Sequence, residues 1–87
     1  MGIVSKEALM LYCKVDEGDP REDLLVELAE TAEADLLSGG AVYNEKTKGR
    51  FALTVKMLTL HNLDNPTGTP IPGGIQRRIN ELKFQKL

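Results

Sequence analysis

Residues 45–63, with the sequence EKTKGRFALTVKMLTLHNL, form the stretch that decides the fold. One face of an α-helix is outlined by the spacing of four positions: Phe51, Val55, Leu58 and Asn62. Five more apolar residues widen this face: Ala52, Leu53, Met57, Leu60 and Leu63. A helix that is apolar over most of its circumference is normally enclosed by other elements. The stretch therefore predicts a central helix on which the rest of the chain packs.

The chain before this stretch has the pattern of two further helices. Ser5 is an N-cap residue, and a short helix is expected from there to about Lys14. Its apolar side is expected to carry Ala8, Leu11, Tyr12 and Val15. A longer helix is expected over residues 20–37, because Asp19 is a strong N-cap and Glu22 stands where a capping box requires it. The stripe that this helix buries is expected to consist of Leu25, Leu28, Ala29, Ala32 and Leu36.

The chain after the central stretch begins with an irregular segment. Residues 64–74, DNPTGTPIPGG, hold three prolines and three glycines, which predicts a long loop. A last helix is expected from about Ile75, with Ile75, Ile79 and Leu82 facing inward. The sequence thus predicts an all-α fold. It is a small four-helix bundle, short–long–long–short, with a long Pro/Gly loop between helices three and four, and residues 1–87 form one domain.

Composition limits the core and the cellular setting. A chain of 87 residues without tryptophan has a thin, aliphatic core. The single cysteine, Cys13, excludes an internal disulfide. No signal peptide and no apolar run long enough to span a membrane are visible, so we expect a soluble protein of a reducing cytoplasm with no membrane partner.

Charge is divided unevenly along the chain. Residues 1–44 hold three bases and ten acids, a net charge of −7, whereas residues 45–87 hold eight bases and three acids, a net charge of +5. Halves of opposite sign pair either within one subunit or between copies. For pairing between copies, the expected acidic residues are Asp23, Glu27 and Glu30. The expected basic residues are Lys46, Lys48, Arg50 and Lys56.

The residues that most often carry chemistry do not form a recognisable set. Cys13 has no histidine near it in sequence and is expected to be a small packing residue. His61 is the only histidine and has no second ligand at metal-binding spacing. Gly39 and Gly40 lack the lysine and serine or threonine that follow in a phosphate-binding loop. The sequence therefore predicts no catalytic residue, no cofactor and no metal site.

Several short segments resemble one known family when they are taken in order. They are residues 11–16 (LYCKVD), 19–25 (DPREDLL), 29–33 (AETAE), 53–63 (LTVKMLTLHNL), 65–68 (NPTG), 71–75 (IPGGI) and 79–83 (INELK). Over almost its whole length the chain is similar to the phage head–tail connector family, small proteins of tailed phages and prophages that are often described as possible DNA-packaging proteins. It departs from that family at residues 60–65, LHNLDN, which lack an aromatic pair and an arginine.

The resemblance implies a structural role. A connector subunit without catalytic activity would assemble as a dodecameric ring beneath the portal protein. It would join the DNA-filled head to the next tail-completion or stopper protein, with DNA in the channel. Assembly would take place in the bacterial host cytoplasm, and the finished ring would lie at the virion head–tail junction. The residues expected to dock on portal or stopper are Asn65, Pro66, Thr67, Pro70, Ile71 and Pro72.

A second function class remains open from the residues alone. Arg77, Arg78 and Lys83 of the last helix are suited to contact phosphates, as in a small helical nucleic-acid-binding module. The preceding connection carries three prolines and is much longer than the turn of a helix-turn-helix motif. A gel-shift titration distinguishes the two classes.

Overall fold

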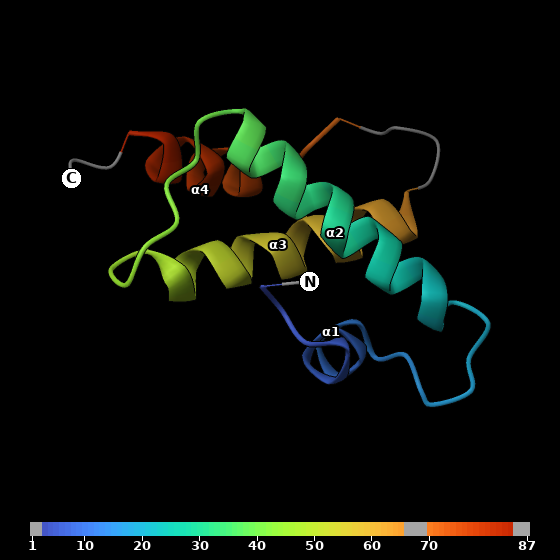
Figure 1. Cartoon of the computed structure of the whole chain (residues 1–87). Coiled ribbons are helices and arrows are strands. Elements are labelled where there is room, and N and C mark those ends of the chain that lie inside the picture. Colours follow the sequence, from blue (N-terminus) through green and yellow to red (C-terminus); the bar gives the residue numbers. More distant parts are fainter. Residues whose placement is uncertain (1–2, 66–69, 85–87) are drawn as a thin grey trace.

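Helix α3 (Lys48–Asp64) lies at the centre of the molecule, and the other helices pack against it (Figure 1). They are α1 (Lys6–Cys13), α2 (Glu22–Ser38) and α4 (Gly73–Lys83). The computed structural model describes residues 3–65 and 70–84, and within these ranges it holds four helices and no strand. The all-α prediction is confirmed.

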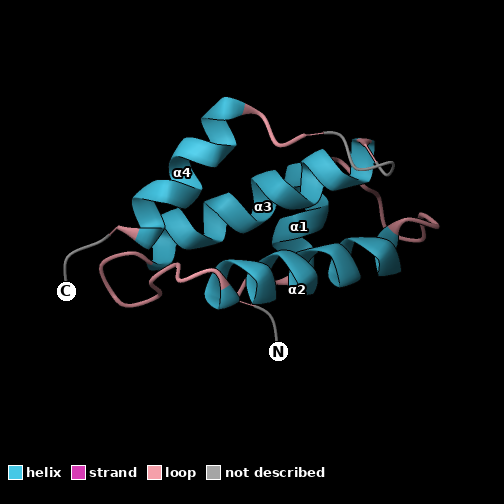
Figure 2. Ribbon diagram, turned by 90° about the horizontal axis from the view of Figure 1, so that it is seen from above, coloured by secondary structure: helices cyan, strands magenta, loops and turns pink. Residues whose placement is uncertain are grey.

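The helices do not all run side by side. Helix α2 packs along α3, whereas α1 crosses this pair and is seen almost end-on in Figure 1. Helix α4 lies over the first half of α3, on the other side from α1 (Figure 2). The molecule is consequently long and flat, with extents of 41 × 27 × 18 Å.

The core is built around the predicted face of α3. Phe51 and Val55 are fully buried and Leu58 is nearly so, as the helical spacing predicts, but Asn62 is exposed. Two threonines, Thr54 and Thr59, are also buried in this helix. Their hydroxyls donate to the carbonyl oxygens of Arg50 (2.8 Å) and Val55 (2.7 Å). These bonds within the helix let two polar side chains enter an apolar core.

The other helices contribute most of the residues predicted for the core. Leu25, Ala29, Ala32 and Leu36 of α2 are buried, and so are Ile75, Ile79 and Leu82 of α4. The prediction for the first helix is correct only in part: Val15 is buried and Tyr12 packs partly buried against the core. Leu9 and Cys13 are buried there, whereas Leu11 is 84% exposed. Residues 8–13 are almost uniformly apolar, so periodicity could not select the buried face.

The predicted helix starts are partly correct. Ser5 caps α1, since its side chain accepts from the N–H of Ala8 (3.2 Å). Asp19 does not cap α2, which begins at Glu22 rather than at residue 20. Its carboxylate instead accepts from the N–H of Arg21 (2.8 Å) and holds the turn before the helix. Glu22 reaches back to the N–H of Gly18 (2.8 Å).

The segment between α2 and α3 is held by polar contacts. Asn44 is not the cap of α3, because its side chain accepts from the N–H groups of Lys46 (2.8 Å) and Thr47 (3.1 Å) in a preceding turn. Thr47 is almost completely buried. Its hydroxyl donates to the carbonyl of Val42 (2.8 Å) and accepts from the N–H of Asn44 (2.9 Å). The N–H of Val42 donates to the carbonyl of Leu82 (3.0 Å), which ties this segment to α4.

The loop between α3 and α4 is shorter than the predicted 64–74. Helix α3 includes Asp64, and α4 begins at Gly73, two residues before Ile75. Two consecutive glycines therefore form the first turn of α4. The connection spans 65–72, of which 66–69 lie outside the described residues.

Candidate docking surfaces

The predicted acidic residues lie together on one exposed strip of α2. Asp23, Glu27 and Glu30 follow one another at intervals of four and three residues, which places them on one face of the helix. All three are exposed, and the buried residues of α2 lie on its opposite side. We call these three residues the acidic strip.

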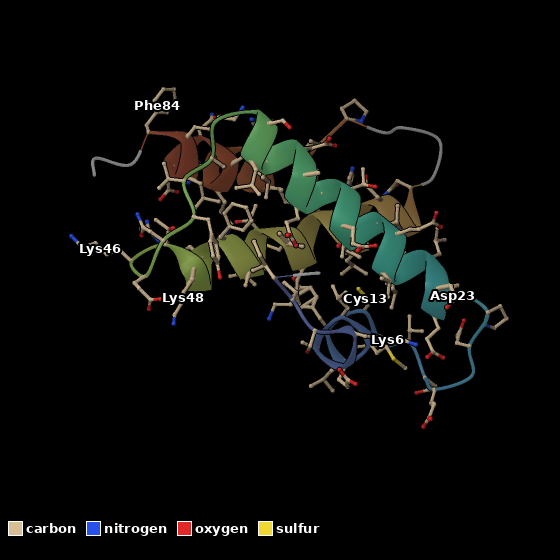
Figure 3. The ribbon with its side chains drawn as sticks, viewed as in Figure 1. Lys6, Cys13, Asp23, Lys46, Lys48 and Phe84 are labelled. Atoms are coloured by element: carbon tan, nitrogen blue, oxygen red, sulfur yellow. The ribbon has the colours of Figure 1, made fainter. Side chains whose placement is uncertain are left out.

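Three of the four predicted basic residues are grouped at the start of α3. Lys46, Lys48 and Arg50 are exposed there, at the end of the molecule opposite Asp23 (Figure 3). We call them the basic end. Lys56 lies apart from this group. It is half-buried, with its ammonium nitrogen 5.7 Å from the centre of the Tyr12 ring, a cation–π contact between α3 and α1.

The ion pairs of the described residues are local. Lys48 pairs with Glu45 (3.0 Å), Arg21 with Asp19 (3.1 Å), and Lys6 of α1 with Glu22 of α2 (2.6 Å). None of them joins the acidic strip to Lys46, Lys48 or Lys56. Facing helices that neutralise each other within one subunit, the alternative left open by the sequence, are thus not seen for these side chains.

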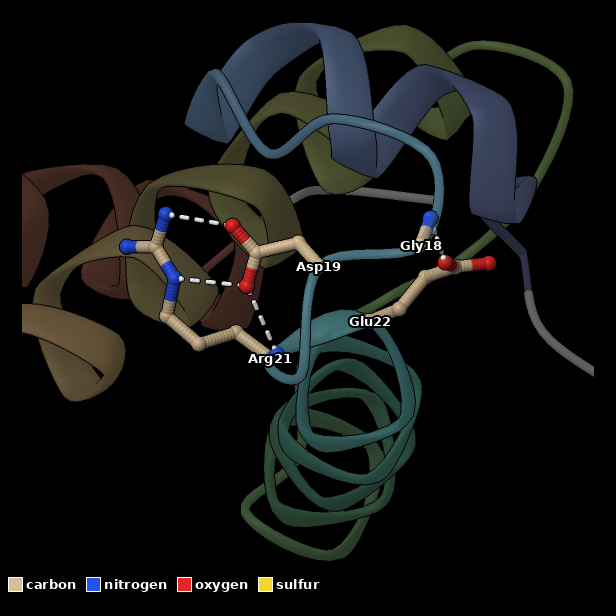
Figure 4. A network of polar contacts seen from close by, with 4 residues as sticks. All are labelled: Gly18, Asp19, Arg21 and Glu22. Atoms are coloured by element: carbon tan, nitrogen blue, oxygen red, sulfur yellow. Dashed lines mark hydrogen bonds and ion pairs between the residues drawn. The ribbon is translucent and has the colours of Figure 1, made fainter.

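The join between α1 and α2 holds a cluster of polar contacts (Figure 4). The Arg21 guanidinium contacts both carboxylate oxygens of Asp19, at 3.2 and 3.1 Å. These bonds hold the pKa of Asp19 below its usual range. The pKa of Glu22 is lowered in the same way, mainly by its bond with Lys6 and to a lesser extent by the N–H of Gly18. The bond to Glu22 raises the pKa of Lys6. The sequence indicated a cap here but not this cluster.

The predicted docking loop is only partly within the described residues. The side-chain nitrogen of Asn65 donates to the carbonyl of His61 (2.9 Å), so Asn65 belongs to the end of α3. Pro70, Ile71 and Pro72 are exposed. Pro66 and Thr67 lie outside the described residues. Ile71 borders a hollow of about 240 Å³ between α2, α3 and α4, whose apolar floor includes Leu36, Leu58 and Ile79.

A second hollow was not indicated by the sequence. It has a volume of about 630 Å³ and lies on the outer side of α1. Its lining consists of Glu7, Met10, Leu11, Lys14, Val15, Asp16 and Glu17. We call it the α1 hollow. Sequence reasoning missed it because Leu11 and Val15 were both expected to pack inward, whereas only Val15 does so.

The remaining candidates for chemistry are placed as follows. Cys13 is buried against the core, and this burial, more than the nearby Asp64, raises the pKa of its thiol. A raised pKa disfavours the reactive thiolate. In the described part of the chain, no three His, Cys, Asp or Glu residues are grouped so that they could hold a metal ion. No helix within that part is long and apolar enough to cross a membrane.

The cations proposed for phosphate contact do not form one strip. Arg77 and Arg78 are exposed on α4, and Arg78 shares a shallow hollow with Arg50 and Glu81. Lys83 is half-buried beside Gly39, at the end of α2. That helix has no basic residue of its own in its last turn, so the ammonium of Lys83 lies where it can offset the helix dipole.

Comparisons with family models, with curated proteins and with solved structures found no match for this chain. The resemblance to head–tail connectors therefore rests on the short sequence segments alone. A functional assignment must be argued from those segments together with the surfaces described above.

Proposed function

We propose that this protein is a head–tail connector subunit of a tailed phage or prophage. Copies assemble as a ring beneath the portal and join the DNA-filled head to the next tail-completion protein. The subunit works by docking and carries out no catalysis. It assembles in the host cytoplasm and then resides at the head–tail junction of the virion.

The separation of the acidic strip from the basic end carries this proposal. Asp23 and Lys46 lie at opposite ends of the long axis (Figure 3), and none of the ion pairs of the described residues joins the acidic strip to Lys46 or Lys48. In a ring, each copy presents one surface to one neighbour and a different surface to the other neighbour. Unlike surfaces of opposite charge suit such a contact and fix its direction.

The loop between α3 and α4 is the proposed contact with portal or stopper. Pro70, Ile71 and Pro72 are exposed beside the hollow of about 240 Å³. Prolines restrict the backbone, so a loop that contains them loses less entropy when it docks. This contact would leave the acidic strip and the basic end available to neighbouring copies.

Charge reversal tests the proposed contact between copies. Glu27→Lys with Glu30→Lys should weaken self-association by at least about tenfold, measured by sedimentation at high concentration with and without portal. Lys46→Glu with Lys48→Glu should do the same. A variant with all four changes should associate again, because both signs are exchanged. Asp64→Lys is the control, because it also replaces an exposed acid with a base but lies outside both surfaces.

The proposal is wrong if the wild-type protein stays monomeric at every salt concentration and does not bind portal. Monomers in dilute solution alone do not contradict it, since a ring can require the portal as a template. If instead the variant with all four charge reversals does not regain association, the proposed charged contact is wrong, but the proposal of ring assembly is not contradicted.

Nucleic-acid binding is the competing function. Arg77 and Arg78 are exposed, but the described surface places Lys83 apart from them. We therefore expect only weak, salt-sensitive and sequence-independent retention of DNA in a gel-shift titration. Tight, sequence-dependent retention that Arg77→Ala and Arg78→Ala abolish would favour the competing function instead.

A further inference from the structure

The α1 hollow exposes apolar surface that no other described part of the subunit covers. A single exposed leucine is ordinary on a protein surface. Leu11, however, is 84% exposed and lines one hollow together with the half-buried Met10, while Val15, which also lines it, is buried. The outer side of α1 thus has the form of a docking site that the subunit itself leaves uncovered.

Charge around the α1 hollow indicates what would fit there. Three carboxylates line it, those of Glu7, Asp16 and Glu17, against the single cation of Lys14. A bulky apolar side chain flanked by cations would be complementary to this lining. An apolar group flanked by acids would be repelled.

The same chain carries such a group at the end of α4. Phe84 is 79% exposed and directly follows Lys83. Among the described large apolar residues, Leu11 and Phe84 are the two most exposed. The outward side of α4 also carries Arg77 and Arg78. Phe84 points away from the body of the molecule, at the far end from α1 (Figure 3), so it cannot reach the α1 hollow of its own subunit.

We propose that the α1 hollow of one copy receives Phe84 of a second copy. This proposal rests on the self-assembly proposed above and names an apolar anchor for it. The ring of Phe84 would cover Leu11 and Met10. Arg77, on the outward side of α4, would be the cation suited to pair with Asp16 and Glu17 of the hollow. Aromatic anchors that fill a pocket contribute most of the energy of many interfaces. Each copy keeps one free hollow and one free Phe84, so the contact continues from copy to copy.

Two variants, each lacking one side of the contact, provide the test. Leu11→Asp damages the hollow, and Phe84→Asp removes the anchor. Each variant alone should self-associate at least about tenfold more weakly than the wild-type protein, measured by sedimentation equilibrium up to about 1 mM. Mixed in equal amounts, they should form a one-to-one heterodimer in preference to larger species, because each pair retains only one intact hollow that meets an intact Phe84.

The controls separate a lost contact from a lost fold. Leu24→Asp places the same change on another exposed leucine outside the hollow, and it should associate like the wild-type protein. Circular dichroism melting of Leu11→Asp and Phe84→Asp should be like that of the wild-type protein, since both side chains are largely exposed. If Leu11→Asp fails to fold, Leu11→Ser replaces it.

The outcomes distinguish this contact from self-assembly in general. Wild-type association that both variants retain would overturn the proposed contact and leave ring assembly intact. Two monomeric variants that do not combine would also overturn it, because the contact would then not be head-to-tail. A wild-type protein that stays monomeric up to about 1 mM, with or without portal, would overturn both proposals.

Discussion

Thr47 illustrates, at the scale of one residue, how a buried polar group can hold a connection together. Its side chain is almost fully buried, and its hydroxyl both donates to the carbonyl of Val42 and accepts from the N–H of Asn44. Val42 is in turn bonded to Leu82 of α4. One hydroxyl thus connects the turn before α3 to the segment that reaches α4.

Replacing Thr47 with valine should destabilise the protein by about 1–3 kcal/mol. Valine keeps the shape but leaves the carbonyl of Val42 and the N–H of Asn44 without this partner. Chemical denaturation with a circular dichroism readout measures the change. Thr31→Val, at an exposed position of α2, should change the free energy of unfolding by much less. Equal effects at both positions would contradict this role of Thr47.

At the scale of helices, the contacts at the join between α1 and α2 stabilise a short helix that would not be stable alone. Helix α1 has 8 residues, and isolated helices of this length are not stable in water. It is held by the burial of Leu9 and Cys13 and by the pair of Lys6 with Glu22 across to α2. Arg21 and Asp19 fix the turn that leads into α2.

The join should make stability depend on pH in a defined direction. The folded-state pKa values of Asp19 and Glu22 are lowered, so their contribution is present above the ordinary carboxyl pKa. It is lost as pH falls through the folded-state values, below about 4. The pKa of Lys6 is raised, so its contribution is complete below the ordinary lysine pKa, about 10.4, and is lost above it.

Thermal melting at a series of pH values checks this linkage. Glu22→Gln should lower the melting temperature at pH 7, and its difference from the wild-type protein should shrink as pH falls towards about 3. Glu30→Gln, on the same helix but outside the cluster, is the matched control. A difference for Glu22→Gln that stays constant from pH 7 to 3 would rule out the ionised pair as its cause.

At the scale of the whole molecule, length and flatness separate unlike surfaces. The longest extent is 41 Å, several times the range over which charges act at physiological salt. In the proposed ring, Asp23 and Lys46, which lie at opposite ends of the molecule, would each interact with a neighbouring copy rather than with each other. Phe84 is likewise far from helix α1 (Figure 3).

Salt should separate the charged and apolar parts of self-association. Raising NaCl from about 0.05 to about 0.5 M shortens the screening length several-fold and should weaken wild-type association. The variant that carries charge reversals at both Glu27 and Glu30 should show the opposite salt dependence, because its like charges repel and salt screens that repulsion. Sedimentation at three salt concentrations measures the trend. Wild-type association that strengthens with salt would show that apolar contact alone drives assembly.

The central helix shows how much of the buried core can be predicted from the sequence. Phe51, Val55 and Leu58 were predicted as its buried face because residues on one side of a helix recur every three to four positions. The same rule predicted Ile75, Ile79 and Leu82. The spacing also places Thr54 and Thr59 on the buried face of α3, but they were not predicted to be buried because threonine is not counted among the apolar residues. Each hydroxyl is satisfied by the carbonyl four residues earlier in its own helix.

The sequence by itself determined that the chain is helical, where the long helices run, and which of their faces are buried, since periodicity and composition are local properties. Only the tertiary structure decided the rest. It turned Leu11 outward, set the cluster at the α1–α2 join, and placed Asp23 at the opposite end of the molecule from Lys46 and Lys48. The reason is physical: an almost uniformly apolar segment such as 8–13 can bury any face, and the neighbour it meets selects one.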